Sequence, residues 1–331
     1  MARVAILGAG KIAEVHARGV LLAGAELAGV FDIREEASRK LAARFSTRTF
    51  QSADDVFHSP DINVVAIATS TETHADYIVA AAKAGKAIFC EKPIDLSVAR
   101  AEECLDQIAG TNVFIQVGFN RRFDPSIKNL ADAVHRGEIG NVEHLTIITR
   151  DATPAPMDYY KTSGGLFKDM TIHDFDISRF ILREEPEVVF ALGSVKSNEQ
   201  FRSINDIDTA TVLLTTPSGA QCQIMNSRRC VYGFDLRIEV FGSDGAVHAE
   251  NLRPHSTALY DKRSTESRPP LSPSYLERFM KSYEGEWQSF FERMLSNGMP
   301  RASFDDGLKA LKIAEAANES LISGQPVPIG R

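Results

Sequence analysis

The first 120 residues alternate short apolar, β-branched runs with longer helical patterns, and this alternation restricts the possible folds more than any other feature. The helical patterns include the alanine-rich stretch 75–84, which Gly85 ends. Buried strands that alternate with helices form βαβ units and a parallel sheet covered on both faces. Residues 1–120 are therefore predicted to form a doubly wound α/β domain, with strands at 3–7, 27–31, 64–68, 87–90 and 113–117.

From Val142 onward the pattern changes to longer strands with apolar and polar residues in alternation. Asp124 and Pro125 indicate an N-cap and the first position of a helix that ends near Gly137. The turns at 217–219 and 243–245 are so short that they can only join antiparallel neighbours. Residues 121–331 are therefore predicted to form an α+β domain with a mainly antiparallel sheet, with strands at 142–150, 188–196, 209–216, 220–228 and 235–242.

Two helical patterns, 274–296 and 304–323, close the chain. The last of them is a candidate to pack back on the first domain. The polar stretch 251–273 contains four prolines and is expected to be irregular.

Composition excludes several classes of protein. The net charge of −7 has the wrong sign for neutralising phosphates, so we expect no nucleic-acid partner. The longest charge-free run, 209–227, is broken by a turn and filled with hydroxyls and amides, so we expect no membrane span. Lys11 and Glu14 follow the apolar run 4–7 too soon for a signal-peptide core. The four cysteines form no Cys-x-x-Cys pair, which argues against zinc and fits a reducing cytoplasm.

A glycine-rich turn directly follows the first expected strand. The segment 8–13 reads Gly-Ala-Gly-Lys-Ile-Ala and opens a helix. Gly8 allows a tight turn, Gly10 allows close approach of a pyrophosphate, and Ala13 allows the helix to pack on the strand. Asp32 follows the second strand, where an acidic side chain binds ribose hydroxyls. Such turns also occur for steric reasons alone, but the full strand–turn–helix context predicts a dinucleotide site on the helix N-terminus.

Two further clusters follow expected strands of the same sheet, at the edge where ligands bind. The first runs from Thr69 to His74; the alternative is that Thr71 only caps a helix and His74 is a surface residue. The second is Glu91-Lys92-Pro93, in which proline restricts the backbone at the lysine. The alternative for Lys92 is an ordinary solvated charge.

A fourth cluster follows Gly164 and Gly165 in the second domain. Asp169 and His173 are four residues apart, which places both on one face of an α-helix. A carboxylate beside an imidazole fixes its tautomer and supports proton acceptance near neutral pH. The alternative is an acidic first turn with a solvated histidine. A metal site at His173, Asp174 and Asp176 is disfavoured, because these side chains point in different directions around a helix.

Together, these segments resemble the glucose-fructose oxidoreductase and inositol dehydrogenase family over nearly the whole chain. The strings 118–125 and 164–176 are similar to those of inositol 2-dehydrogenases and are more specific than the glycine turn. The resemblance implies an N-terminal Rossmann domain and a C-terminal α/β domain with an open sheet. It also implies a cis bond between Lys92 and Pro93, and a catalytic triad of Lys92, Asp169 and His173.

The same resemblance implies a substrate pocket and a cofactor site. Substrate-binding residues would be Arg121, Asp151 and Tyr232 together with the triad. Cofactor-binding residues would be Gly8, Gly10, Lys11, Ile12, Asp32, Ile33, Arg34, Thr69, Ser70, Thr71, His74, Glu91 and Lys92. Met170 and Phe234 replace hydroxyl-bearing residues of some relatives, which bears on the polyol preference more than on the chemistry.

The resulting hypothesis is NAD-dependent oxidation of a ring hydroxyl of a cyclic polyol, myo-inositol first, to 2-keto-myo-inositol. The alternatives are the same chemistry on scyllo-inositol, an aldose or a sugar acid, and a non-catalytic NAD-binding regulator. Asp32 favours NAD over NADP, whereas Arg34 could pair with a 2′-phosphate. Strand 235–241 has one apolar face and one that mixes charge with Phe241. Relatives pair through such a face, so we expect a homotetramer or homodimer.

Overall fold

The computed structural model describes residues 2–152 and 154–330 of the chain. The chain divides into two compact units. The first contains the residues up to Asp124 and Met280–Lys312, and the second contains Pro125–Phe279 and the residues from Ile313 onward.

The first unit has a five-stranded parallel sheet in the order β2-β1-β3-β4-β5. The strands are β1 (Arg3–Leu7), β2 (Glu26–Phe31), β3 (Val64–Ile67), β4 (Ala87–Cys90) and β5 (Ile115–Val117). The predicted doubly wound sheet is therefore confirmed, with each strand within two residues of its expected start. The remaining elements are α1 (Lys11–Leu22), α2 (Glu35–Arg44), α3 (Ala53–His58), η1 (Thr71–Thr73), α4 (His74–Lys83), α5 (Val98–Ile108) and η2 (Asn120–Phe123).

The core of the first unit combines the sheet with residues from near the end of the chain. The helix α10 (Tyr275–Leu295) supplies Trp287 and Phe290, which are fully buried. Both belong to one apolar cluster with Phe89 of β4 and the apolar residues of β1 and α1. In the helix α11 (Phe304–Ser323), Gly307 allows close packing, because a Cβ there would lie 2.5 Å from Ile94 Cδ1.

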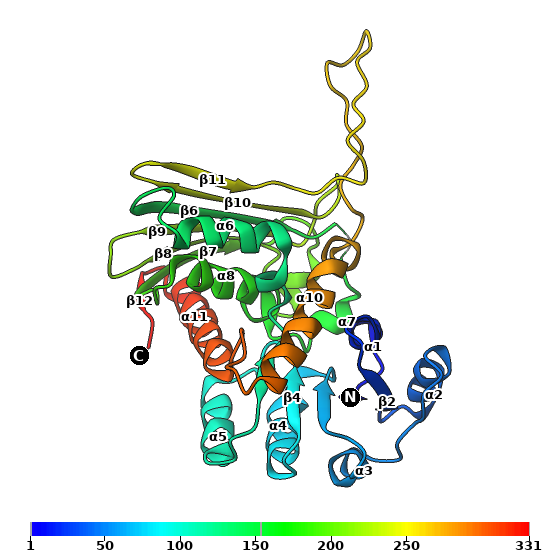
Figure 1. Ribbon diagram of the computed structural model, residues 1–331. Coiled ribbons are helices and arrows are strands. Elements are labelled where there is room, and N and C mark those ends of the chain that lie inside the picture. Colours follow the sequence, from blue (N-terminus) through cyan, green and yellow to red (C-terminus); the bar gives the residue numbers. More distant parts are fainter. Residues whose placement is uncertain (1, 153, 331) are drawn as a thin grey trace. The chain divides into compact units, whose positions relative to one another are not determined.

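The second unit has a seven-stranded sheet in the order β11-β10-β6-β9-β8-β7-β12 (Figure 1). The strands are β6 (Val142–Arg150), β7 (Val188–Ser194), β8 (Thr209–Thr215), β9 (Gln221–Ser227), β10 (Asp235–Gly242), β11 (Gly245–Ala249) and β12 (Val327–Pro328). Each neighbouring pair is antiparallel except β6 and β9, which run parallel. The prediction of a mainly antiparallel sheet is confirmed, and the two short turns join antiparallel strands as expected.

Helices cover one face of this second sheet. The helices α6 (Pro125–His135) and α8 (Ile172–Leu182) pack on each other and on strands of the sheet (Figure 1). In β10 the side chains of Leu236, Ile238 and Val240 are buried on the covered face, whereas Phe241 is 44% exposed on the other. The expected alternation of faces is confirmed. Short elements complete the unit: α7 (Met157–Tyr160), η3 (Phe167–Thr171) and α9 (Gln200–Ser203).

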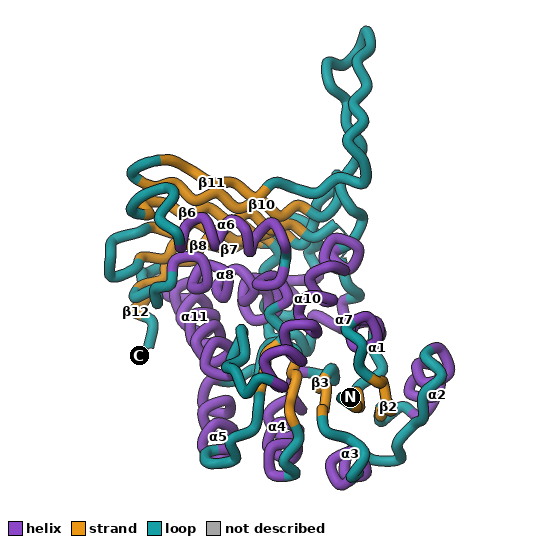
Figure 2. The backbone as a smooth tube through the Cα atoms, viewed as in Figure 1, coloured by secondary structure: helices purple, strands orange, loops and turns teal. Residues whose placement is uncertain are grey.

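Residues 250–274 join β11 to α10 without a regular element, and they form a long arm that extends away from the second sheet (Figures 1 and 2). An isolated bridge between Leu259 and Ser267 holds the two sides of the arm together. The prediction of an irregular segment is confirmed. Within residues 2–152 and 154–330, no helix is both long and apolar enough to cross a bilayer.

Candidate active site

The glycine turn between β1 and α1 has a backbone that requires glycine. Gly8 has φ = 101°, and a Cβ there would lie 2.3 Å from the carbonyl oxygen of Ala68. Gly10 is the N-cap of α1, and a Cβ there would meet no atom within 4 Å. Gly10 has no side chain to cap the first N–H groups of this helix. Open space beside uncapped donors fits a pyrophosphate group, so the turn fits a dinucleotide.

Asp32 is tied to this turn by backbone hydrogen bonds. Its Oδ2 accepts from the Ala9 amide at 2.7 Å, and its Oδ1 accepts from the Arg34 amide at 2.8 Å. The Arg34 guanidinium also donates to Oδ1, at 3.3 Å between Nε and the oxygen. Ile33 is 86% exposed beside them. The carboxylate is thus held at the end of β2, at the place where ribose hydroxyls bind in this fold.

His74 lies in the core of the first unit. It is fully buried, and its Nδ1 donates to the carbonyl oxygen of Pro93 at 2.8 Å. Burial lowers the pKa of His74. The alternative of a surface histidine is therefore wrong: His74 connects the loop after β3 to the loop after β4. The capping alternative for Thr71 is also wrong, because the N-cap of α4 is Thr73, and Thr71 begins η1.

Glu91 and Lys92 follow β4 directly. The Glu91 side chain is buried, with Oε1 2.7 Å from His16 Nε2 and Oε2 accepting from the Lys92 amide at 3.2 Å. Burial alone would raise the pKa of Glu91, but the His16 hydrogen bond and the charge of Lys92 outweigh it, and the pKa is lowered. Lys92 is half-buried, and the bond from Lys92 to Pro93 is cis. Lys92 is thus held next to an ionised carboxylate.

In the second unit, Asp169 lies in a π-helical turn and not in the regular α-helix that the spacing predicted. The turn η3 runs directly into α8, whose first turn contains His173. The two glycines before it, Gly164 and Gly165, both have φ = 84°. A π-turn pairs residues five apart, so a separation of four no longer guarantees one face. Such turns interrupt helices frequently at functional sites.

Both oxygens of the Asp169 carboxylate have partners within the second unit. The Tyr159 hydroxyl donates to Oδ1 at 2.6 Å, and Arg228 Nη1 donates to Oδ2 at 2.8 Å. Burial and the charge of Asp169 raise the pKa of Tyr159. Burial also raises the pKa of Tyr160, and the charges of Asp151 and Asp169 add to this effect. The charges of Asp151 and Asp169 thus both act on the Tyr160 hydroxyl.

Arg228 is a functional candidate that the sequence analysis missed. It follows β9 and is 1% exposed, with its Cζ 4.3 Å from the centre of the Tyr160 ring. Its second ion-pair partner is Asp206, at 3.7 Å from Nη2 to Oδ2. The charges of Asp169 and Asp206 keep the pKa of Arg228 raised despite its burial, which alone would lower it. In the sequence Arg228 is the last residue of the strand expected at 220–228 and the first of two adjacent arginines, and no local signal marks it.

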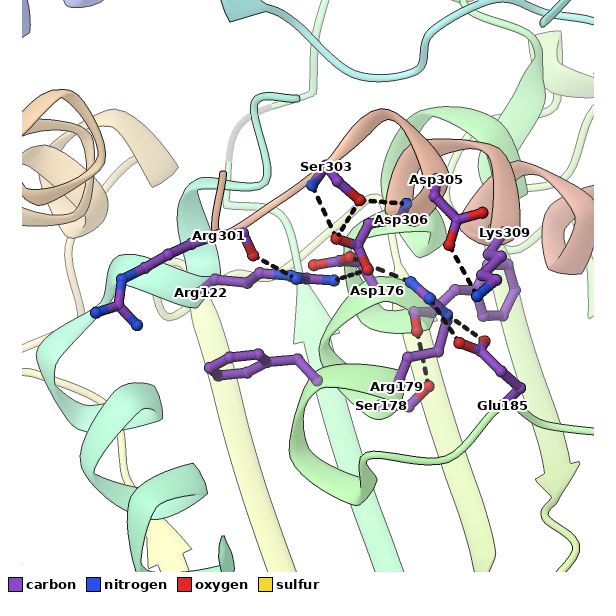
Figure 3. A network of polar contacts seen from close by, with 12 residues as sticks. Arg122, Asp176, Ser178, Arg179, Glu185, Arg301, Ser303, Asp305, Asp306 and Lys309 are labelled. Atoms are coloured by element: carbon purple, nitrogen blue, oxygen red, sulfur yellow. Dashed lines mark hydrogen bonds and ion pairs between the residues drawn. The ribbon is translucent and has the colours of Figure 1, made fainter. Parts of the chain in front are cut away.

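Arg121 and its neighbour Arg122 lie in η2, and both are buried. Arg122 Nη2 lies 3.0 Å from Asp306 Oδ1, and its Nη1 donates to the Arg301 carbonyl at 2.6 Å (Figure 3). Ser303 also donates to Asp306 through its amide and hydroxyl. Arg122 thus holds the start of α11.

Tyr232 belongs to a different cluster of the second unit. Its hydroxyl accepts from Arg150 Nη1 at 2.6 Å and donates to Asp235 Oδ2 at 2.8 Å. Tyr232 and Asp235 line a cavity of about 640 Å³ together with Arg237. Asp151 is half-buried and donates its amide to the Ser227 carbonyl at 2.9 Å. Among the residues that the structure describes, no group of three His, Cys, Asp or Glu side chains could hold a metal ion.

Comparison with known proteins agrees with these features. Residues 2–119 match the family described as "Oxidoreductase family, NAD-binding Rossmann fold", and residues 127–248 match the "GFO/IDH/MocA C-terminal domain". The inositol 2-dehydrogenase of Rhizobium meliloti (strain 1021) is 43% identical over 328 residues, which cover 99% of both chains.

Two solved structures extend this similarity to the fold. A myo-inositol dehydrogenase from Corynebacterium glutamicum has a TM-score of 0.95 at 38% identity, covering 100% of this chain and 99% of its own. The scyllo-inositol dehydrogenase of Lactobacillus casei, solved with bound NAD(H) and scyllo-inositol, has a TM-score of 0.91 at 26% identity and 99% coverage of both chains. The chain therefore belongs to the GFO/IDH/MocA oxidoreductase family with an NAD-binding Rossmann fold.

Proposed function

We propose that this protein is an NAD-dependent dehydrogenase that oxidises one ring hydroxyl of a cyclic polyol, with myo-inositol as the best substrate. The observation that carries the proposal is the Asp169 carboxylate, whose two oxygens each accept a hydrogen bond from a side chain: Oδ1 from Tyr159 and Oδ2 from Arg228. A regulator without turnover has no need for a carboxylate fixed in this way. The similarity to inositol 2-dehydrogenases over 99% of the chain supports the same activity.

The catalytic roles follow from general acid–base chemistry. His173 would take the proton of the reacting hydroxyl, and Asp169 would orient its imidazole. Lys92 would stabilise the negative charge that develops on the oxygen. When bound, NAD supplies the hydride acceptor for the carbinol carbon. Arg121, Asp151 and Tyr232 are proposed to hydrogen-bond the other hydroxyls of the substrate.

We propose that the two units have different roles in the reaction. The first would hold the dinucleotide through the glycine turn, the Asp32 segment and the loops after β3 and β4. The second would supply Asp169 and His173 and the face through which subunits pair.

NAD is expected to be preferred over NADP by at least ~10-fold in kcat/KM, which corresponds to roughly 1.4 kcal/mol. Asp32 is the reason: its carboxylate accepts hydrogen bonds from ribose hydroxyls and repels a 2′-phosphate. Arg34 could reverse this preference, but its guanidinium already donates to Asp32. The measurement is kcat/KM with each cofactor for the wild type and for Asp32→Ser, in which the ratio should narrow. Equal efficiency of the wild type with both cofactors would contradict the prediction.

The substrate proposal is tested by NADH formation with a panel of polyols and sugars. Myo-inositol should give the highest kcat/KM, because a site built to hydrogen-bond several hydroxyls discriminates against analogues that place them differently. A higher kcat/KM for scyllo-inositol or an aldose would make that compound the substrate and would leave the dehydrogenase activity itself unchanged. A higher value for an aldonate or uronate would indicate that Arg121 binds a carboxylate. NAD binding without turnover of any compound would favour a regulator.

The protein is expected to form a homotetramer or homodimer through the open face of the second sheet. The strand registers place Leu192, Leu213 and Phe241 on this face, and each is more than 40% exposed. Several large apolar side chains on one open face are typical of a protein interface. Light scattering should give the mass of two or four chains. Leu213→Arg should dissociate the assembly, whereas Leu22→Arg on the exposed side of α1 should not; a monomeric wild type would refute the prediction.

A further inference from the structure

His16 is a fully buried histidine on α1, one turn past the glycine loop. Its Nδ1 accepts a hydrogen bond from Trp287 Nε1 at 3.1 Å. An indole N–H can only donate, so Nδ1 carries no proton. The proton of the imidazole is therefore on Nε2, which donates to Glu91 Oε1 at 2.7 Å. The packing of Trp287 thus determines the tautomer of His16.

Trp287 has little freedom to move away from this position. It is fully buried, and its ring stacks on Phe89 with 4.6 Å between the centroids. Gly19, one turn after His16, makes room for the indole, because a Cβ there would lie 2.5 Å from Trp287 Cδ1. The helices α1 and α10 thus pack closely around one hydrogen bond, whose two residues are 271 positions apart in the sequence.

Glu91, which accepts the hydrogen bond from His16 Nε2, is buried. A Cβ on Gly118 would lie 3.1 Å from Glu91 Oε1, so the carboxylate packs directly on the backbone. The charged or titratable groups that face it are His16, Lys92 and His74. Its second oxygen accepts from the backbone amide of Lys92 at 3.2 Å. A buried carboxylate that loses a hydrogen-bond donor is driven toward its protonated form, and the side-chain donor to Glu91 Oε1 is His16.

We propose that His16 and Trp287 are positioning residues for Lys92: they hold the Glu91 carboxylate in place, and Glu91 fixes the backbone of the lysine by accepting the hydrogen bond of its amide. This inference rests on the role of Lys92 in the proposed function. The chain Trp287–His16–Glu91–Lys92 lies entirely within the first unit. It joins three distant parts of the sequence at the residue proposed to stabilise the oxyanion.

A purely structural role for His16 gives a different expectation. In that case its replacement would lower the stability of the fold and leave the kcat of the folded protein unchanged. In the proposed role, loss of the Nε2 donor lowers kcat by ~10–100-fold, the range measured for groups that orient the ligands of a metal centre. KM for NAD should change less than kcat, because the glycine turn and Asp32, which would hold the pyrophosphate and the ribose, are untouched.

The kinetic test compares His16→Met with His16→Gln below their unfolding temperatures. The amide of the Gln variant can still donate to Glu91, so it should recover most of the kcat that the Met variant loses. The matched control is His135→Met, because His135 Nε2 contacts the carbonyl oxygens of Phe180 and Ile181 at 3.1 Å in the second unit. This control should lose stability only. Equal kcat for His16→Met and the wild type would overturn the proposal.

A second measurement does not depend on turnover. Infrared difference spectra between each protein and its Glu91→Gln counterpart isolate the signal of the Glu91 side chain. The wild type should show an ionised carboxylate at neutral pH, and His16→Met should show a protonated carboxyl. An ionised Glu91 in His16→Met would overturn the proposal even if kcat fell. If the wild type oxidised no polyol, the proposed function would fail, while the infrared result would still decide whether His16 controls Glu91.

Discussion

Replacement of Lys92 by methionine is expected to lower kcat by ~10²–10⁴-fold, the contribution typical of a positioned acid–base group. Methionine keeps the length and apolar stem of the lysine but removes the ammonium that would stabilise the oxyanion. The fold should survive, because Lys92 is half-buried and Glu91 keeps its bond to His16. NADH binding, measured by fluorescence, should stay within a few-fold of the wild type, so that the loss appears in kcat and not in cofactor affinity.

Lys86 provides the matched control in the same unit. Its ammonium donates to the carbonyl oxygens of Ser59 and Ile62 at 2.8 and 2.7 Å, so it has a structural role. Lys86→Met should lower the unfolding temperature and leave kcat unchanged. If Lys92→Met turned over like the wild type, Lys92 would be the solvated charge that the sequence left open as an alternative.

The elements that the sequence predicted best are those determined by local patterns. The glycine turn, the apolar runs of the first sheet and the alternation in β6 and β10 depend on neighbouring residues only. The observed bounds of β6 and β10 equal the expected ones, 142–150 and 235–242. Helix α11 also begins and ends where the pattern predicted. Periodicity and turn residues are sufficient for such elements.

What the sequence could not predict depends on distant parts of the chain. The two residues of β12 form a strand only because they pair with β7, about 140 residues earlier. The parallel pairing of β6 with β9 has no local signal either, since a strand pattern does not specify its neighbour's direction. The π-turn at 167–171 looks like ordinary helix in sequence.

The candidate site likewise combines features that depend on local sequence with features that depend on distant parts of the chain. The sequence identified Asp169, Glu91 and Lys92 by position, but not the groups that hold them. From the sequence alone, His16 and Trp287 are residues within two predicted helices, and Arg228 is one of many charged residues. Nothing in the local pattern distinguishes them. Their roles arise from burial and from partners that only the tertiary structure supplies.

Replacement of Arg228 by methionine is expected to lower both stability and turnover. The guanidinium faces two carboxylates, Asp169 and Asp206, whose side chains are only 11% and 9% exposed. Breaking a buried ion pair by removing one partner costs about 3–5 kcal/mol, because the remaining charge is left uncompensated. Urea unfolding should therefore show a loss of this size for Arg228→Met.

Turnover should fall as well, because Asp169 would lose the Arg228 guanidinium, which donates to its Oδ2. We expect kcat at a temperature where the variant is folded to fall by at least ~10-fold. Arg228→Lys should recover part of the stability and less of the kcat, since an ammonium cannot stack on Tyr160 and bridge two carboxylates as a planar guanidinium can. Arg229→Met, an exposed neighbour with the same change of charge, should behave as the wild type. A folded Arg228→Met protein with undiminished kcat would show that the orientation of Asp169 does not limit the reaction.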